Sequence, residues 1–157
     1  MTNIQDEFEF YAADDDYPLI PDDEYWAECT EYKKQDYFIK GQTKKKKLYL
    51  CFHVYANENS LDNMSEKIWM AFNMPLNGRV GKRSKYWTAW IKVWGKPPSR
   101  KALMSPKIFL NRQYKIKTRT VKRYHGGEFR PESEWYSVVD EILMALPKTY
   151  PNSQHSL

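Results

Sequence analysis

Residues 47–56 read KLYLCFHVYA, and the alternation of side chains in this stretch decides the fold class. Large apolar side chains recur at every second position: Leu48, Leu50, Phe52 and Val54. The positions between them carry a more polar set: Tyr49, Cys51, His53 and Tyr55. Because successive side chains of a strand point to opposite faces, this pattern predicts a β-strand with one buried face.

The segments around this strand repeat the period of two or mark its ends. Residues 24–39 predict a strand with a kink near 33–36, and GQTKKKK at 41–47 predicts a turn that carries four lysines. Residues 57–63 have the composition of a turn, and residues 66–74 predict a third strand. That third strand places four apolar side chains on one face and Trp69 and Asn73 on the other: Ile68, Met70, Phe72 and Met74.

Two segments have helical spacing instead. Residues 84–94 place aromatic and apolar side chains on one face of a helix: Tyr86, Trp87, Trp90, Ile91 and Trp94. Ser84 is positioned to cap the start of this helix, Gly95 to cap its end, and the Pro-Pro pair that follows stops it. Residues 133–146 predict a second amphipathic helix, with these residues on its apolar side: Trp135, Val138, Val139, Ile142, Leu143 and Leu146.

The expected fold is mainly β with helices, in the order strand, strand, strand, helix, strand and C-terminal helix, with a further short strand near 107–110. This order is typical of a small, partly open Greek-key barrel such as the OB-fold. A generic α+β sheet with two packed helices is the alternative. We expect one domain at 24–146, a flexible acidic arm at 1–23 and a flexible tail at 147–157.

Charge is distributed unevenly along the chain, although the formal net charge is only +5. Residues 1–31 hold eleven acidic side chains and no Lys or Arg. From Arg79 to Arg123 there are fifteen Lys and Arg residues and no Asp or Glu. Because a solvated surface usually mixes both signs, this run indicates a surface that meets a polyanion.

The stretch SKYWTAWIKVWGKPPSRK at 84–101 combines three tryptophans with five basic side chains. Since the rings follow the helical face, we expect most of them to pack in the core, with Trp87 or Trp94 as an exposed edge. The basic side chains off that face are then the candidates for phosphate contact.

Residues 114–124, YKIKTRTVKRY, return to strict alternation and end at the His-Gly-Gly turn of 125–127. One face is expected to pack: Tyr114, Ile116, Thr118 and Thr120. Lys115, Lys117 and Arg119 share the other face, about 6.5–7 Å apart. That spacing is close to the spacing of phosphates along a strand and predicts a polyanion-binding stripe. A solvated edge strand that uses Lys against aggregation is the alternative.

The lysine run lies next to Tyr49 and Tyr55, on the outer face of the first strand described above. Proteins that bind single strands combine rings that stack on bases with basic side chains that follow the backbone, whereas a solvated turn is the alternative. Tyr37, Phe38 and Tyr124 are further aromatic candidates. The expected nucleic-acid-binding residues are Lys44, Lys45, Lys46, Lys47, Tyr49, Tyr55, Trp69, Arg79, Lys82, Arg83, Lys85, Lys92, Arg100, Lys101, Arg112, Lys115, Lys117, Arg119, Lys122 and Arg123.

The sequence predicts no catalytic set, metal site or cofactor, so we expect a protein that is not an enzyme. The histidines lie in unrelated contexts, and Cys51 with His53 lacks further ligands at the spacing of a zinc site. There is no GxxxxGK[ST] phosphate loop. Two cysteines without a disulfide framework, an acidic N-terminus unlike a signal peptide and no long apolar run predict a cytoplasmic protein with no membrane partner.

Three stretches together resemble small OB-fold single-stranded DNA-binding proteins of phages and mobile genetic elements. They are YPLIPDDEYWAECTEY (17–32), RKALMSPKIFLNRQYKIKTRTV (100–121) and WYSVVDEIL (135–143). The resemblance implies an OB-fold and a place in phage or plasmid DNA metabolism. The chain departs from standard bacterial single-strand-binding proteins because its acidic segment is N-terminal and its C-terminus, PNSQHSL, has no acidic tip.

Two functions are therefore expected. The first is non-catalytic binding of nucleic acid, with single-stranded DNA favoured. The second is inhibition of a host defence nuclease or CRISPR complex, since mobile elements of this kind also encode such small inhibitors, including anti-CRISPR proteins. In that case the acidic arm would dock on a host or element-encoded protein or ribonucleoprotein.

Overall fold

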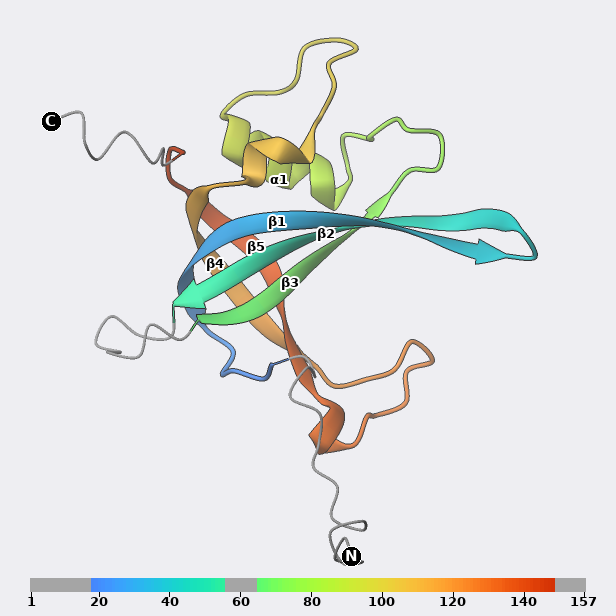
Figure 1. The fold of residues 1–157 in the computed structure, drawn as a ribbon, viewed down its shortest axis with the longest axis vertical. Coiled ribbons are helices and arrows are strands. Elements are labelled where there is room, and N and C mark those ends of the chain that lie inside the picture. The colour runs from blue at the N-terminus through green and yellow to red at the C-terminus, as the bar shows by residue number, and fades with distance from the viewer. Residues whose placement is uncertain (1–17, 56–64, 149–157) are drawn as a thin grey trace, which may run out of the picture.

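The structure, a computed structural model, describes residues 18–55 and 65–148. The elements in this part are β1 (Glu24–Ile39), β2 (Gln42–Tyr55), β3 (Ser65–Met74), α1 (Lys85–Trp94), the 3₁₀ turn η2 (Pro106–Phe109), β4 (Arg112–Val121), the 3₁₀ turn η3 (Glu132–Glu134) and β5 (Tyr136–Ala145). Over these residues the fold is mainly β, with one α-helix between the third and fourth strands (Figure 1). None of the helices described has the length and apolar character of a membrane span.

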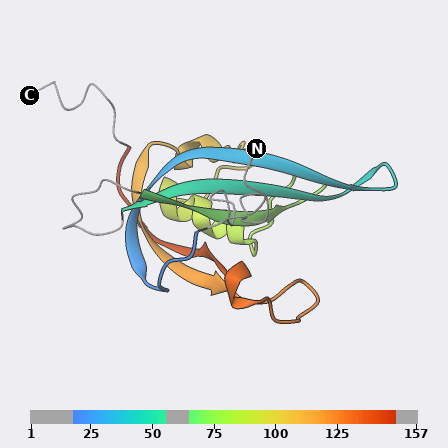
Figure 2. The same cartoon turned by 60° about the horizontal axis from the view of Figure 1, so that its bottom comes forward.

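The strands of the described residues form one sheet that closes into a ring in the order β1-β2-β3-β5-β4. β1 pairs with β2 along most of its length and with β4 through residues 24–29, so the ring is closed where the sequence predicts a partly open one. β3 and β5 meet in parallel at Trp69 and Val138. The long hairpin of β1 and β2 projects beyond the ring (Figures 1 and 2).

The inside of the ring holds the apolar core, and the alternation of β2, β3 and β4 predicts most of it. The buried side chains of these strands on the predicted faces are Leu48, Leu50, Phe52, Val54, Ile68, Met70, Phe72, Tyr114, Ile116 and Thr118. The Phe52 and Tyr114 rings meet edge to face, with their centroids 5.5 Å apart. The mainly β fold with an inserted helix is therefore confirmed.

The helix α1 begins and ends as the sequence predicts. The Ser84 hydroxyl accepts the Trp87 backbone N–H at 3.1 Å, and Gly95, with φ of 93°, donates its N–H to the Ile91 carbonyl at 2.7 Å. The predicted buried face is wrong in part, because Ile91 is only half-buried, whereas Trp94, which is 47% exposed, is the exposed edge that the sequence predicts beside half-buried Trp87. The buried set is Tyr86, Ala89, Trp90 and Val93. The buried face of the helix therefore combines the small side chains of Ala89 and Val93 with the rings of Tyr86 and Trp90, and Trp94 lies at its edge.

The predicted C-terminal helix at 133–146 is wrong, because this segment forms η3 and then strand β5. β5 contains two β-bulges, where Asp140 and Leu143 have no partner in the register with β4. The first bulge shifts the phase of the strand, so the buried residues Ser137, Val139 and Ile142 are two and then three positions apart. A step of three imitates the i, i+3 spacing of a helix, which explains the wrong prediction.

Three smaller predictions are corrected. The lysine run is not in a loop: Lys45, Lys46 and Lys47 lie within β2, and the turn is at 40–41. Residues 107–110 do not form a strand, because Pro106 opens η2 and the Ser105 hydroxyl caps it. The irregularities of β1 lie at 29–31 and 37–38 rather than at 33–36.

Residues 18–23 lie against the ends of β4 and β5. The Ser137 N–H donates to the Pro18 carbonyl at 2.9 Å, the Thr118 N–H donates to the Asp23 carbonyl at 2.9 Å, and the Thr120 hydroxyl donates to Asp22 at 2.6 Å. This part of the predicted arm is therefore attached to the ring, at the end opposite α1 (Figure 1). Residues 1–17, 56–64 and 149–157, with the predictions made for them, lie outside the described residues.

Candidate nucleic-acid interface

The strand register brings aromatic and lysine side chains together on the outer face of β1, β2 and β3. Tyr49 of β2 lies opposite Lys33 of β1 and Ala71 of β3, and Trp69 of β3 lies opposite Cys51. Because Leu48 and Leu50 are buried in the core, Tyr49 between them faces outward.

Five residues of this face form what we call the aromatic–lysine cluster: Lys33, Tyr37, Lys47, Tyr49 and Trp69. The Tyr49 and Trp69 rings meet edge to face, with centroids 6.5 Å apart, and the Tyr37 and Tyr49 hydroxyls are hydrogen-bonded at 2.8 Å. The Lys33 ammonium lies 5.4 Å from the centroid of Trp69, and the Lys47 ammonium lies 5.8 Å from that of Tyr37. The Trp69 and Tyr37 rings thus each lie beside a cation, while part of the cluster stays accessible to solvent.

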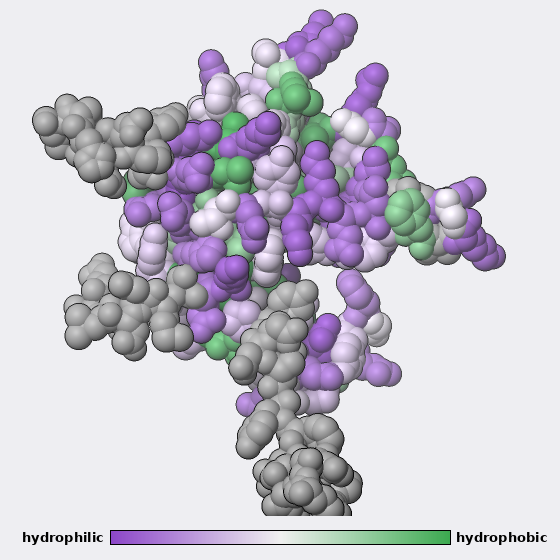
Figure 3. Space-filling model, viewed as in Figure 1, coloured by the Kyte–Doolittle hydropathy of each residue, from purple (hydrophilic) through white to green (hydrophobic). Residues whose placement is uncertain are grey.

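The surface around this cluster is hydrophilic and continues onto the projecting hairpin. Figure 3 shows it from the side on which β1, β2 and β3 face the viewer. Towards the hairpin the outward positions are neutral or basic, since Gln35 and Asn73 flank Lys47, and Lys45 pairs with Tyr37. Towards the end of the sheet away from the hairpin, the outward positions of β1 include the acidic residues Glu28 and Glu31. The positive charge of the face is therefore concentrated in its hairpin half.

A second set of rings and cations lies in the loop between β4 and β5. We call it the loop cluster: Lys122, Arg123, Tyr124, Phe129, Arg130 and Trp135. The Arg123 guanidinium lies 3.7 Å from the centroid of Phe129, that of Arg130 lies 4.6 Å from Tyr124, and the Lys122 ammonium lies 4.8 Å from Trp135. The Tyr124 hydroxyl donates to Glu134, which raises the pKa of Tyr124. Figures 1 and 2 show this loop and the hairpin extending towards the same side of the molecule.

The predicted stripe on β4 lies on an outer strand face but among carboxylates. Arg119 donates from Nε to Asp140 at 3.0 Å, and the Lys115 ammonium lies 5.3 Å from the centroid of Trp26. Lys117 has Glu24 and Glu141 as its strand neighbours. Carboxylates of β1 on one side and of β5 on the other therefore reduce the positive potential of this stripe.

Three other predicted residues donate hydrogen bonds to backbone carbonyl groups near α1. Lys85 donates to Ala71 at 3.4 Å, Lys92 donates to Ile142 at 2.8 Å, and Arg112 donates to Val93 at 3.4 Å. Lys92 is also paired with Glu141 at 3.6 Å. Burial lowers the pKa of Lys85, and the nearby charge of Arg119 acts in the same direction. These contacts attach α1 to the sheet.

The structure brings together four predicted residues in the region of the aromatic–lysine cluster and two, Lys122 and Arg123, in the loop cluster. Lys45, Lys47, Tyr49 and Trp69 share the outer face of β2 and β3. Arg79, Lys82 and Arg83 lie in the exposed loop before α1, Arg100 and Lys101 lie in the loop after it, and Tyr55 is exposed at the end of β2. Lys46 lies on β2 between the outward positions, and the side chain of Lys44 is not among those described.

Sequence reasoning missed Lys33 and half of the loop cluster, namely Phe129, Arg130 and Trp135. The signal for Lys33 was its period-two spacing with Gln35 and Tyr37. The signal for the loop cluster was the adjacency of arginine and aromatic residues on both sides of the Gly-Gly turn, at 123–124 and at 129–130.

Within 18–55 and 65–148, no three His, Cys, Asp or Glu side chains gather closely enough to hold a metal ion. Burial raises the pKa of Cys29 to about 12 and that of Cys51 to about 11, so both thiols are protonated at neutral pH. The predicted role of the acidic arm in inhibiting a host complex involves residues 1–17, which lie outside this part of the chain, as well as the attached residues 18–23.

No protein-family model, curated protein or solved structure matches the chain.

Proposed function

We propose that this protein is an OB-fold module that binds single-stranded nucleic acid, with DNA favoured, and that it performs no catalysis. The OB-fold assignment is supported by the strand order β1-β2-β3-β5-β4 and by α1 between β3 and β4. In OB-folds the face of the second and third strands and the loops after the first and fourth strands bind oligonucleotides. The observation that carries the proposal is the aromatic–lysine cluster on that face.

The chemistry of the cluster suits a single strand better than a duplex. Bases of a single strand expose their ring faces, and Trp69 and Tyr37 offer rings on which such bases stack. Stacking of this kind contributes about 1–3 kcal/mol per base and tolerates any sequence. Lys33 and Lys47 lie beside these rings and are placed to neutralise adjacent phosphates. A duplex presents its phosphates but hides its base faces, so it can contact the lysines of the cluster but cannot stack on the rings.

The loop cluster supports the same function at a second place. Phe129 is 63% exposed and Tyr124 is 40% exposed, and each has an arginine against its ring. A strand that crosses the outer face of β2 and β3 can extend towards this loop.

The test is fluorescence anisotropy with single-stranded DNA, single-stranded RNA and duplex DNA of about 15 nucleotides. Replacing Trp69 by Leu keeps an apolar side chain but removes the stacking ring. We expect affinity for the DNA strand to fall by about 5- to 150-fold, the equivalent of about 1–3 kcal/mol. Trp94→Leu is the matched control, because it removes an accessible tryptophan ring from α1, at another surface.

A second variant separates the two basic surfaces. The change of Lys115, Lys117 and Arg119 together to Gln removes the β4 stripe, and we expect it to weaken binding only slightly. If this variant loses binding while Trp69→Leu binds normally, the β4 stripe is the interface and the proposed face is wrong. Duplex binding as tight as single-strand binding would overturn the proposed preference, and tighter RNA binding would overturn the choice of DNA.

A further inference from the structure

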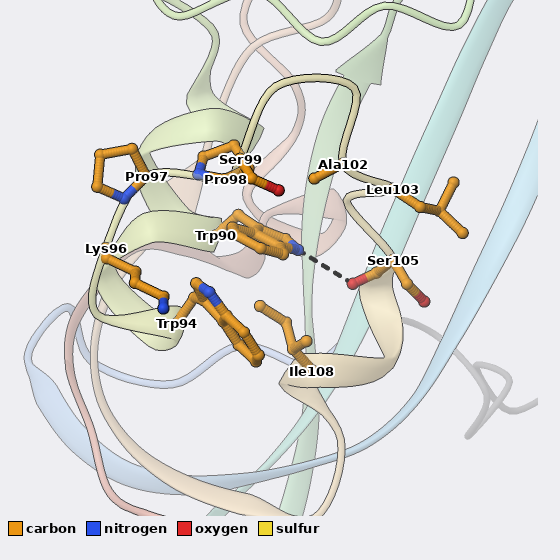
Figure 4. Close-up of a pocket in the computed structure, with 10 residues that line it drawn as sticks. All are labelled: Trp90, Trp94, Lys96, Pro97, Pro98, Ser99, Ala102, Leu103, Ser105 and Ile108. Atoms are coloured by element: carbon orange, nitrogen blue, oxygen red, sulfur yellow. Dashed lines mark hydrogen bonds between the residues drawn. The ribbon is translucent and has the colours of Figure 1, made fainter.

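An apolar groove lies at the α1 end of the ring, away from the aromatic–lysine cluster. It has a volume of about 500 Å³ and lies between α1, the loop that follows and η2 (Figure 4). Its apolar lining includes Trp90, Trp94, Pro97, Leu103 and Ile108. The Trp90 Nε1–H donates to the Ser105 carbonyl at 3.1 Å, and the Trp90 and Trp94 ring centroids are 5.5 Å apart. The Trp90 side of the groove is therefore held by ring packing and a hydrogen bond.

The domain leaves large apolar side chains of this groove exposed. Trp94 is 47% exposed and Leu103 is 88% exposed, whereas Trp90 beneath them is buried. Aliphatic groups such as Leu103 and Pro97 have no stacking face for a base, so they suit an apolar side chain of a protein better than a nucleotide.

The rim of the groove is basic. Lys96 lines it, and Arg100, Lys101 and Lys107 are exposed on the same two segments. Every lining residue comes from the run 79–123, which contains no Asp or Glu. An apolar lining inside a rim of one charge is complementary to an acidic segment that carries a large apolar side chain.

We propose that this groove binds an acidic linear segment of a partner protein, whose aromatic or aliphatic side chain lies between Trp94 and Leu103. The acidic N-terminal sequence of this chain is the competing occupant, although it would have to cross the ring to reach the groove, because residues 18–23 are attached at the end opposite α1. The inference does not depend on the proposed nucleic-acid function, since no residue of the aromatic–lysine cluster lines the groove.

The probe is a fluorescein-labelled synthetic peptide of about nine residues, roughly 30 Å when extended, that alternates Asp with Phe or Leu. Anisotropy is measured against the full chain. We expect binding that weakens with salt and that is lost when every Phe and Leu becomes Ala or every Asp becomes Asn. Leu103→Asp should weaken binding about tenfold or more, because it removes an apolar contact and adds a repelling charge. Leu103 is 88% exposed, so its loss does not disturb the core.

Leu76→Asp is the matched control, since Leu76 is 53% exposed and is not part of the groove. Equal affinity of the peptide for the unchanged chain and Leu103→Asp would overturn the proposal, as would equal binding of the Ala peptide. If a peptide of residues 1–17 displaces the probe and binds more tightly, the occupant is the chain's own segment and the assignment to a partner is wrong. Trp69→Leu should keep peptide binding and Leu103→Asp should keep oligonucleotide binding, so the two proposals can fail separately.

Discussion

Tyr114 shows how a single side chain joins the sheet to the segment that precedes it. Its ring is buried, and its hydroxyl donates to the Phe109 carbonyl at the end of η2 at 2.6 Å. Tyr114→Phe keeps the ring and leaves that carbonyl without its donor. A buried group that loses its partner costs about 1–3 kcal/mol, so we expect the free energy of unfolding in urea to fall by that amount.

The control for Tyr114→Phe is Tyr25→Phe. The Tyr25 hydroxyl donates to the Pro21 carbonyl at 2.6 Å, but this bond is exposed and water can replace it. Its loss should change the free energy of unfolding by less than about 0.5 kcal/mol. Equal losses in the two variants would show that burial does not decide the strength of the Tyr114 bond.

The two buried thiols predict a loss of stability at alkaline pH. Desolvation raises the pKa of Cys29 to about 12 and that of Cys51 to about 11, from an ordinary thiol value of 9.0. The folded chain therefore holds these protons more tightly than the unfolded chain does. The resulting stabilisation is complete below the unfolded pKa and is lost as the pH rises through the folded values.

Urea midpoints at about pH 7.5 and about pH 10.5, with a reductant present, measure this loss. The double variant Cys29→Ala and Cys51→Ala should show a smaller fall in midpoint between the two conditions. A residual fall remains, because burial also raises the pKa of Tyr86 and Tyr114. The same fall in both proteins would show that the thiols contribute nothing to the pH dependence.

At the scale of elements, the end of α1 depends on one glycine. Gly95 has φ of 93°, a left-handed conformation in which its N–H reaches the Ile91 carbonyl. Gly95→Ala places a Cβ in that conformation and should cost about 1–2 kcal/mol of stability. Nothing lies near the added Cβ, so the cost comes from the backbone alone.

Gly126→Ala is the matched control for this prediction. Gly126 also has open space around an added Cβ but does not have a positive φ. Thermal unfolding should place this variant within about 0.5 kcal/mol of the unchanged chain. A loss as large as that of Gly95→Ala would mean that the left-handed cap is not the cause.

The sequence predicts elements well where one period continues without interruption. The strict alternation of Leu48 to Val54 predicts the buried face of β2, and Ser84 and Gly95 mark the ends of α1 correctly. It fails at β5, where bulges at Asp140 and Leu143 replace the period of two by a mixed spacing. A bulge depends on the partner strand, so local sequence does not reveal it.

The β1 residues of the candidate site are hard to predict from the sequence for the same reason. In β1, Ala27 and Cys29 are buried, and continued alternation would turn Lys33 and Tyr37 inward as well. The register shift between Cys29 and Glu31 reverses the phase, so Lys33 pairs with outward-facing Tyr49. Tyr49 and Trp69 were predicted because β2 and β3 show no such shift in their pairing. The β1 residues that complete the cluster can be assigned to the outer face only when the register of β1 with β2 is known.

At the scale of the whole molecule, the uneven charge makes the position of a basic residue more informative than the net charge. The chain has a formal net charge of +5, and Lys92 on α1 and Arg119 on β4 have a carbonyl and a carboxylate partner, respectively. Lys33 and Lys47 instead lie against rings on the proposed face. Lys33 and Lys47 should therefore contribute more to the binding of single-stranded DNA than two lysines elsewhere on the surface do.

Salt dependence measures this difference. For single strands, the slope of log affinity against log salt changes by about 0.7 for each phosphate contact. The double variant Lys33→Gln and Lys47→Gln should therefore bind single-stranded DNA with a slope shallower by about 1.4. The control Lys92→Gln and Lys117→Gln removes the same two charges from surfaces where Glu141 is close. It should leave the slope almost unchanged, whereas equal slopes in the two double variants would mean that only net charge matters and that the cluster makes no defined phosphate contact.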